Sequence, residues 1–218
     1  MIKTILLTGS VLMLTASLIS GGQSVWISGK AVVAQWLLNN AWQRSVSTQT
    51  PDKAWPWADT APVARLSIPS LGESFIVLSN ASGEALAFGP GLVAGNPDKL
   101  SEQAIAIGGH RDTHLSILEA VAPGTRIWLQ NIQGQSQQYQ INQHQIIDSR
   151  TQSIALNQSQ AGLVLITCYP FNAATVGGPL RLVLTADPVP FTAPAIDTLI
   201  EIANSAESYH VSGFDPHL

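Results

Sequence analysis

Cys168, His110 and Arg181 are the residues of this chain whose types suit an attack on a carbonyl carbon. A thiolate supplies the nucleophile, an imidazole carries the proton, and a permanently charged guanidinium stabilises the negative charge that develops on the carbonyl oxygen. The chain has one cysteine, so Cys168 forms no disulfide within it. The alternative is that each residue is ordinary: a buried cysteine, a hydrogen-bonded histidine and a surface arginine. The separations of 58 residues (168 − 110) and 13 residues (181 − 168) do not decide between these interpretations.

Each of the three residues lies at an end of a predicted β-strand. Cys168 closes an apolar run at 163–168, His110 follows a run that ends in two glycines, and Arg181 opens the last run. A side chain at the end of a strand can reach solvent, and partial exposure is what a reactive thiol needs.

The body of the chain is predicted to consist of strands. Seven short segments of β-type composition, separated by turn residues, cover 64–68, 74–78, 104–108, 126–130, 138–148, 162–168 and 180–186. One short helix is predicted at 115–121. Short strands at this spacing favour a closed or partly closed barrel, and a β-sandwich has the same pattern.

The first 29 residues are predicted to anchor the chain in a membrane. The segment at 5–27 is mostly apolar and uncharged, and about 20 such residues span a bilayer. A cleaved signal peptide is the alternative; we favour a retained anchor because no A-x-A cleavage site is present. Under both interpretations the body of the protein lies outside the cytoplasm.

A helix is expected at 31–42, followed from Ser45 by a linker of prolines and small polar residues that spaces the barrel from the membrane. Trp26, Trp36 and Trp42 suit the level of the lipid headgroups, and they suit an ordinary packed helix equally. The predicted divisions are an anchor (1–29), a helix with a linker (30–60), a barrel (61–187) and a tail (188–218) with a short amphipathic helix at 195–206.

The segments around the three residues resemble the motifs of the sortases, a family of cysteine transpeptidases. The run Leu163-Val-Leu-Ile-Thr-Cys168 is similar to the sortase signature Thr-Leu-x-Thr-Cys, and the segment 109–113, Gly-His-Arg-Asp-Thr, is similar to the histidine motif. Arg181 with the next two residues is similar to the arginine that follows one strand later. The three motifs occur in the family's order. Ile166 and Leu115 depart from the usual residues at their positions, and neither belongs to the triad.

Longer stretches resemble the proteobacterial subgroup that is often called marine or class GN. These stretches are 30–42, 55–59, 62–66, 86–91, 167–171 and 177–181. The resemblance covers roughly 26–186, and the segment 92–103 matches the family less well.

The resemblance implies an eight-stranded β-barrel, one strand more than the pattern predicts, and a cysteine transpeptidase that uses no cofactor. Cys168 would form a thioester with an LPxTG-like C-terminal sorting signal of an exported protein, and an amine would then accept the acyl group. His110 would protonate the leaving amine, and Arg181 would stabilise the oxyanion. The expected location is the inner membrane, with a single span and the barrel in the periplasm.

Thr167, Tyr169, Asp112 and His114 are expected to contact substrate because they flank the cysteine and the histidine. Asp112 either tunes a histidine or caps a turn. His110 and His114 lie four residues apart, as two zinc ligands on a helix do, but the glutamate of H-E-x-x-H is missing and the preceding residues indicate a strand. We therefore predict no metal site.

The composition narrows the classes of protein to which the chain can belong. Hydrophobic residues make up 45% of the chain and charged residues 11%, which predicts a folded domain. A net charge of −4 without a basic run argues against nucleic acid as a partner. Two alternatives to the transpeptidase stay open: a cysteine hydrolase that releases its substrate, and a peptide-binding scaffold of the cell envelope without catalysis.

Overall fold

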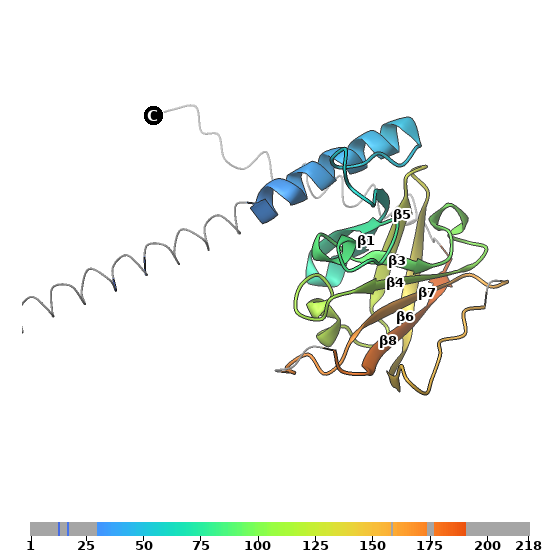
Figure 1. The fold of residues 1–218 in the computed structure, drawn as a ribbon. Coiled ribbons are helices and arrows are strands. Elements are labelled where there is room, and N and C mark those ends of the chain that lie inside the picture. Colours follow the sequence, from blue (N-terminus) through green and yellow to red (C-terminus); the bar gives the residue numbers. More distant parts are fainter. Residues whose placement is uncertain (1–12, 14–16, 18–29, 158, 174–176, 191–218) are drawn as a thin grey trace, which may run out of the picture. The chain divides into compact units, whose positions relative to one another are not determined.

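The computed structural model describes residues 13, 17, 30–157, 159–173 and 177–190, and they form a closed β-barrel (Figure 1). Its strands are β1 (Pro62–Ile68), β2 (Glu73–Leu78), β3 (Gly91–Ala94), β4 (Ala104–Gly109), β5 (Arg126–Asn131), β6 (Ser136–Asp148), β7 (Gly162–Cys168) and β8 (Leu180–Val189). Around the barrel the order is β1-β2-β3-β4-β7-β8-β6-β5. The predicted eight-stranded barrel is confirmed, and the β-sandwich alternative is excluded.

Strand β3 is the strand that the sequence pattern missed. It is four residues long and begins at Gly91, inside a Gly-Pro-Gly segment that indicates a turn. A Cβ at Gly91 would lie 2.1 Å from the backbone oxygen of Asn80, so only glycine allows this close approach. A single pair, Leu78 with Gly91, joins β3 to β2, and β4 is its antiparallel partner on the other side.

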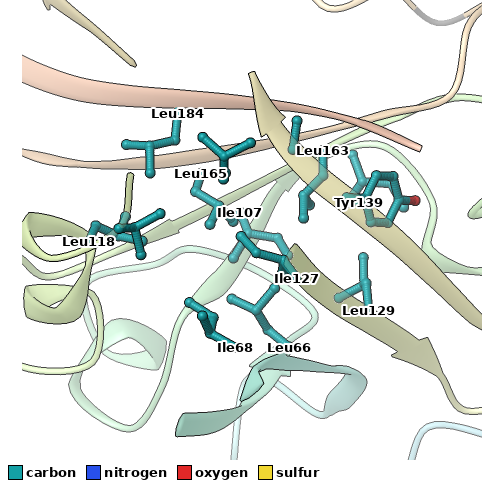
Figure 2. Packing of buried hydrophobic residues seen from close by; sticks show 14 of the residues in the cluster. Leu66, Ile68, Ile107, Leu118, Ile127, Leu129, Tyr139, Leu163, Leu165 and Leu184 are labelled. Atoms are coloured by element: carbon teal, nitrogen blue, oxygen red, sulfur yellow. The ribbon is translucent and has the colours of Figure 1, made fainter. Parts of the chain in front are cut away.

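The core fills the inside of the barrel with aliphatic side chains from alternating strand positions (Figure 2). In β1, Leu66 and Ile68 point inward and are fully buried, opposite Ile127 and Leu129 of β5. Each such side chain stabilises the fold by about 1.5–3 kcal/mol relative to an exposed one. This alternation is the pattern from which the strands were predicted.

Strands β4 and β7 form the parallel pair at the centre of the site described below. Their register runs from Ala104 opposite Gly162 to Gly109 opposite Thr167. Residues 104–108 are all buried, as expected for a strand that is covered on both faces. A one-residue slip would turn every side chain of β4 to the other face, so packing holds the register firmly.

The short helices are single 3-10 turns. They are η1 (Pro69–Leu71), η2 (Ala85–Ala87), η3 (Pro97–Lys99) and η4 (Ser116–Glu119). The helix predicted at 115–121 is thus a 3-10 turn, with Leu118 buried in the core.

A helix at 30–48 packs against the barrel, and it continues past the predicted end at 42. Leu38, Ala41 and Trp42 are buried against Ile76 and Leu78 of β2. Protein atoms therefore cover Trp42, which decides for this residue in favour of the packed-helix alternative. Trp36 is exposed, and Trp26 lies outside the described residues.

The segment that follows this helix was predicted to be a spacer and instead packs against the same part of the barrel. Ala54 and Ala58 are buried, and the Trp55 ring meets the Phe88 ring edge-on with their centroids 4.9 Å apart. Part of the predicted spacer is therefore packed against the barrel instead of extending from it.

The predicted anchor at 5–27 and the tail helix at 195–206 lie outside the described residues, apart from Met13 and Ser17. Within the described part of the chain, no helix combines the length and hydrophobicity needed to cross a bilayer. The boundaries of the anchor, linker, barrel and tail stay predictions.

Candidate active site

The ends of β4 and β7 bring His110 and Cys168 next to each other. Gly109 and Thr167 are partners in the parallel ladder, and His110 and Cys168 follow them directly in the chain. The Thr167 hydroxyl donates a hydrogen bond of 2.9 Å to the Gly109 carbonyl oxygen. Residues 58 positions apart in the sequence therefore meet at one edge of the barrel.

Arg181 lies directly opposite Cys168 in the antiparallel ladder of β7 and β8. The next link is a hydrogen bond of 3.0 Å from the Tyr169 N–H to the Leu180 oxygen. Directly opposed residues point to the same face, with Cβ atoms about 4.5–5.5 Å apart. His110, Cys168 and Arg181 thus come from three neighbouring strands, β4, β7 and β8, in that order. Cys168 and Arg181 are half-buried and His110 is exposed.

The Arg181 side chain curls back toward the segment that precedes it. One guanidinium nitrogen, Nη1, donates to the carbonyl oxygens of Gly178 (2.6 Å) and Leu180 (2.8 Å). A guanidinium has five N–H donors, so its other nitrogens keep donors for a substrate oxygen.

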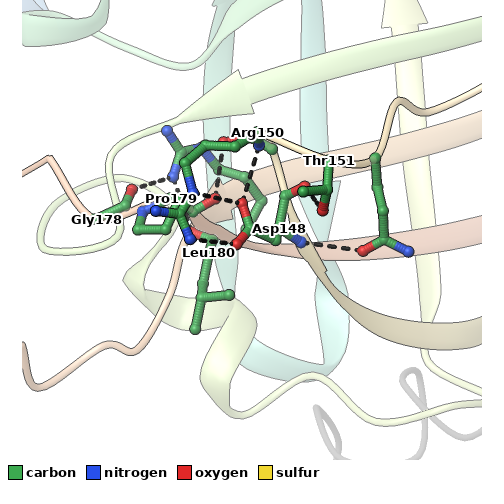
Figure 3. Close-up of polar contacts among 9 residues, drawn as sticks. Asp148, Arg150, Thr151, Gly178, Pro179 and Leu180 are labelled. Carbon is green, nitrogen blue, oxygen red and sulfur yellow. Dashed lines mark hydrogen bonds and ion pairs between the residues drawn. The ribbon is translucent and has the colours of Figure 1, made fainter.

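The turn directly after β6 is hydrogen-bonded to the segment 178–180, which leads into Arg181 (Figure 3). Both the backbone N–H and the hydroxyl of Ser149 donate to the Pro179 oxygen, at 3.0 Å and 2.7 Å. One residue before, Asp148 accepts hydrogen bonds from the side chain and backbone N–H of Arg150, and these lower the pKa of Asp148 to about 2. The ion pair between Asp148 and Arg150 stabilises the turn after β6. Ser149, which lies in that turn, holds Pro179, two residues before Arg181.

The loop that carries His110 folds back onto the core. The Leu115 N–H donates to the His110 oxygen at 3.1 Å, and the Leu115 side chain is fully buried. A Cβ at Gly109 would lie 2.7 Å from Cγ of Leu115, so this position favours glycine. Leu115, which departs from the family pattern, therefore supports the His110 loop from the core and does not belong to the triad.

Comparison with known families decides the identity of the fold. The family model described as a sortase domain matches residues 66–189, more than half of the chain. The chain belongs to the sortase family. No curated protein gives a significant match in sequence.

Solved sortases share the barrel at low sequence identity. Sortase A from Corynebacterium diphtheriae has a TM-score of 0.55 at 20% identity, over 65% of this chain and 66% of that one. Sortase C-1 from Actinomyces oris has a TM-score of 0.50 at 22% identity, over 60% and 76% of the two chains. Sortase C1 from Streptococcus suis has a TM-score of 0.50 at 19% identity, over 61% and 75%. The chain spans just under two thirds of the C. diphtheriae protein, and at these identities the likeness concerns the fold alone.

The residues expected to contact substrate in this sortase differ in their surroundings. Thr167 is 2% exposed and its hydroxyl is bonded to Gly109, so its burial does not support contact with a substrate. Tyr169 is half-buried, with its ring centroid 6.3 Å from that of Phe171, and both rings pack against the core. Asp112 is exposed in the loop after His110.

His114 lies at the other side of that loop. Its ring meets the Phe75 ring edge-on at 6.2 Å between centroids, and Thr113 Oγ1 lies 3.4 Å from its Nδ1. Burial of the ring, and then the charge of His110, lower the pKa of His114. His110 and His114 belong to a loop, so the helical spacing of two zinc ligands does not apply to them. In the described ranges, no group of three or more histidine, cysteine, aspartate or glutamate side chains is placed to hold a metal ion.

Ser149 is the residue of this region that sequence reasoning missed. It lies in a polar connection after β6 that carries no motif of its own. By resemblance to the sortases, the connection at 148–161 would shape the groove for the sorting peptide, and the alternative is an ordinary polar loop. This is the one signal in the sequence that points to the region.

Proposed function

We propose that this sortase is a cysteine transpeptidase in which Cys168, His110 and Arg181 carry the reaction. The observation that supports it most is the direct pairing of Cys168 with Arg181 across β7 and β8, with His110 at the end of the adjacent strand. A nucleophile, a proton carrier and a fixed cation on three neighbouring strands are the groups that acyl transfer requires. A peptide-binding scaffold needs none of them.

The first half of the proposed reaction forms a thioester. The Cys168 thiolate attacks the carbonyl carbon of the scissile peptide bond, and the free N–H groups of Arg181 stabilise the resulting oxyanion. His110, as imidazolium, gives its proton to the nitrogen of the leaving amine while the C–N bond breaks. The products are an acyl-enzyme and a free amine, and His110 is left neutral.

The second half transfers the acyl group. An incoming amine attacks the thioester carbonyl, its surplus proton goes to neutral His110, and the C–S bond breaks to restore the thiolate and the imidazolium. Water in place of the amine gives hydrolysis.

The proposed substrate is an exported protein with an LPxTG-like C-terminal sorting signal, as the resemblance to the proteobacterial sortases implies. Tyr169, Asp112 and His114 are proposed to contact this peptide or the acceptor, and Thr167 to hold the two catalytic strands together. A single N-terminal span in the inner membrane, with the barrel in the periplasm, completes the proposal.

Intact-mass spectrometry of the full chain in detergent, after incubation with a library of LPxTG-type peptides, tests the proposed nucleophile. We expect wild type to gain the mass of an acyl fragment and to lose it on treatment with hydroxylamine, whereas Cys168→Ala gains nothing. His110→Ala should abolish the adduct, and the matched control His144→Ala, an exposed histidine of β6, should keep it. An adduct that survives in Cys168→Ala refutes the nucleophile, and peptide binding without any adduct supports the scaffold.

A further inference from the structure

A pocket borders the loop after His110 at the side chain of His114. It has a volume of about 180 Å³ and is bounded by the helix at 30–48, β1, β2 and the turn at 88–90. The residues that give it its chemistry are Gln35, Asn39, Arg65, Ser74, Phe75 and His114. None of the triad residues lines it.

Arg65 is the only charged side chain among the described residues that line this pocket, His114 being neutral at neutral pH. Its guanidinium carbon lies 5.3 Å from the centroid of the Trp42 ring, and Nη2 is 3.5 Å from the Asn39 side-chain oxygen. Burial lowers the pKa of Arg65, which means that the cation is partly removed from water. Within the described residues no carboxylate forms an ion pair with it. A partly desolvated cation without a counter-ion favours an anionic ligand.

The other end of the pocket reaches the catalytic loop. His114 lines the pocket, and it is close enough to His110 for the charge of one ring to lower the pKa of the other. Around the barrel the order is β2, β3, β4, β7, so the pocket lies on the β2 side of His110 and Cys168 on the β7 side. The strand that ends before His110 therefore lies between β2, which lines the pocket, and β7, which carries the thiol. A base at that strand end can take a proton from a nucleophile that attacks an acyl group on Cys168.

We propose that this pocket binds the acceptor of the transfer step, and that the acceptor is a primary amine that also carries an anionic oxygen group, a carboxylate or a phosphate, paired with Arg65. The inference rests on the proposed function and adds the chemical class of the second substrate. The anionic end lies at Arg65 and the amine end points toward His110. The amine nitrogen bonds to the thioester carbon, its proton passes to His110, and the Cys168 thiolate leaves.

Binding of small acceptors to the full chain in detergent, measured by isothermal titration calorimetry, tests the pocket without any need for catalysis. The probes are glycylglycine, with a carboxylate, and glycylglycinamide, which has the same amine and no anion; O-phosphoethanolamine distinguishes a phosphate from a carboxylate. We expect wild type to bind one of the two anionic probes about tenfold more tightly than the amide, as a charge-assisted hydrogen bond gives. Arg65→Gln should lose the difference, and the matched control Arg126→Gln, an exposed arginine of β5, should keep it.

Arg65→Gln also removes the contact with Trp42 and could disturb the fold. A second variant therefore tests the anion site with that contact in place. Ser74 lies two residues from Ile76, the partner of Arg65 in the β1–β2 ladder, and therefore on the same face of the sheet. Ser74→Asp thus places a carboxylate within reach of the guanidinium while Arg65 and Trp42 stay intact. We expect Ser74→Asp to lose the preference for the anionic probes, and Ser74→Asn to keep it.

Equal affinities of wild type for the charged and uncharged probes would overturn the proposed site, as would a preference that persists in Arg65→Gln and Ser74→Asp. The acyl-enzyme assay distinguishes a failure of the proposed acceptor site from a failure of the proposed function. An acyl-enzyme that transfers to glycylglycine and to O-phosphoethanolamine no faster than to glycylglycinamide refutes the pocket and leaves the transpeptidase standing. An anion-selective pocket in a chain that never forms the acyl-enzyme refutes the acceptor role together with the transpeptidase.

Discussion

Thr167 is the side chain that links the two strands of the candidate site most directly. It is buried, and its hydroxyl donates to the Gly109 oxygen, one residue before His110. The bond is part-buried, so loss of the donor leaves a partly desolvated carbonyl oxygen without this partner, which lowers the stability of the fold. Thr167 therefore sets the distance between the strand that ends in the thiol and the strand that ends before the imidazole.

Thr167→Val keeps the shape of the side chain and removes the donor. We expect the free energy of unfolding to fall by about 1–3 kcal/mol, as for other buried hydrogen bonds, and the rate of acyl-enzyme formation to fall with it. Urea unfolding and the mass assay measure the two quantities. Thr167→Ser, which keeps the hydroxyl, should retain most of the rate; a valine variant as active and as stable as wild type would show that the bond has no such role.

At the scale of elements, the turn after β6 and the segment before β8 act on each other through Ser149. Its N–H and hydroxyl hold the Pro179 oxygen, and Arg181 follows two residues later with its own bonds to Gly178 and Leu180. The turn lies outside the triad but determines where the guanidinium stands when β8 begins.

Ser149→Ala should weaken the position of Arg181 without unfolding the barrel. We expect acyl-enzyme formation to slow several-fold, on the order of the loss of one neutral hydrogen bond, because the backbone N–H still holds Pro179. Alkylation of Cys168 by iodoacetamide needs no oxyanion stabilisation, so its rate should not change. The control Thr151→Ala removes a long bond of 3.4 Å in the same turn and should leave both rates as they are. Equal slowing of alkylation would instead indicate a general disturbance of the site.

The strands also show which local sequence patterns predict secondary structure correctly. Strands β1, β4 and β7 were predicted because their apolar residues alternate or run without interruption. Strand β3 was missed because four residues that begin in a turn motif carry no periodicity. The packed segment after the helix was missed because the partner of Trp55 is Phe88, which lies 33 residues away (88 − 55).

At the scale of the whole molecule, Tyr139 is the fully buried tyrosine of the described residues. Tyr139 of β6 is fully buried in the main core, and its hydroxyl donates to the Leu100 oxygen at 2.7 Å. Burial raises the pKa of Tyr139 above its ordinary value of 10. The unfolded chain therefore releases this proton near pH 10 while the folded chain keeps it. The resulting stabilisation is complete below pH 10 and is lost as the pH rises further.

Tyr139→Phe should remove the contribution of this phenol to the loss of stability at alkaline pH. At pH 8 we expect the variant to be less stable than wild type by about 1 kcal/mol, because the bond to Leu100 is lost. Between pH 10 and pH 11 its free energy of unfolding should decline less steeply than that of wild type. Urea unfolding across this range measures both, with Tyr169→Phe, which leaves Tyr139 in place, as the control. Identical slopes for wild type and Tyr139→Phe would show that the buried phenol does not titrate on unfolding.

The sequence by itself determined the residue types of the candidate site, most of the strands and the order of the motifs, because side-chain chemistry and strand periodicity are local properties. It left open a barrel or a sandwich, since both produce the same alternation of buried and exposed residues. Only the tertiary structure decided that Cys168 stands opposite Arg181, that His110 directly follows the neighbouring strand, and that Arg65 lines a pocket in which no carboxylate of the described residues pairs with it. Which strands pair, and in which register, depends on hydrogen bonds and core contacts between residues far apart in the chain, and no short stretch of sequence contains both partners.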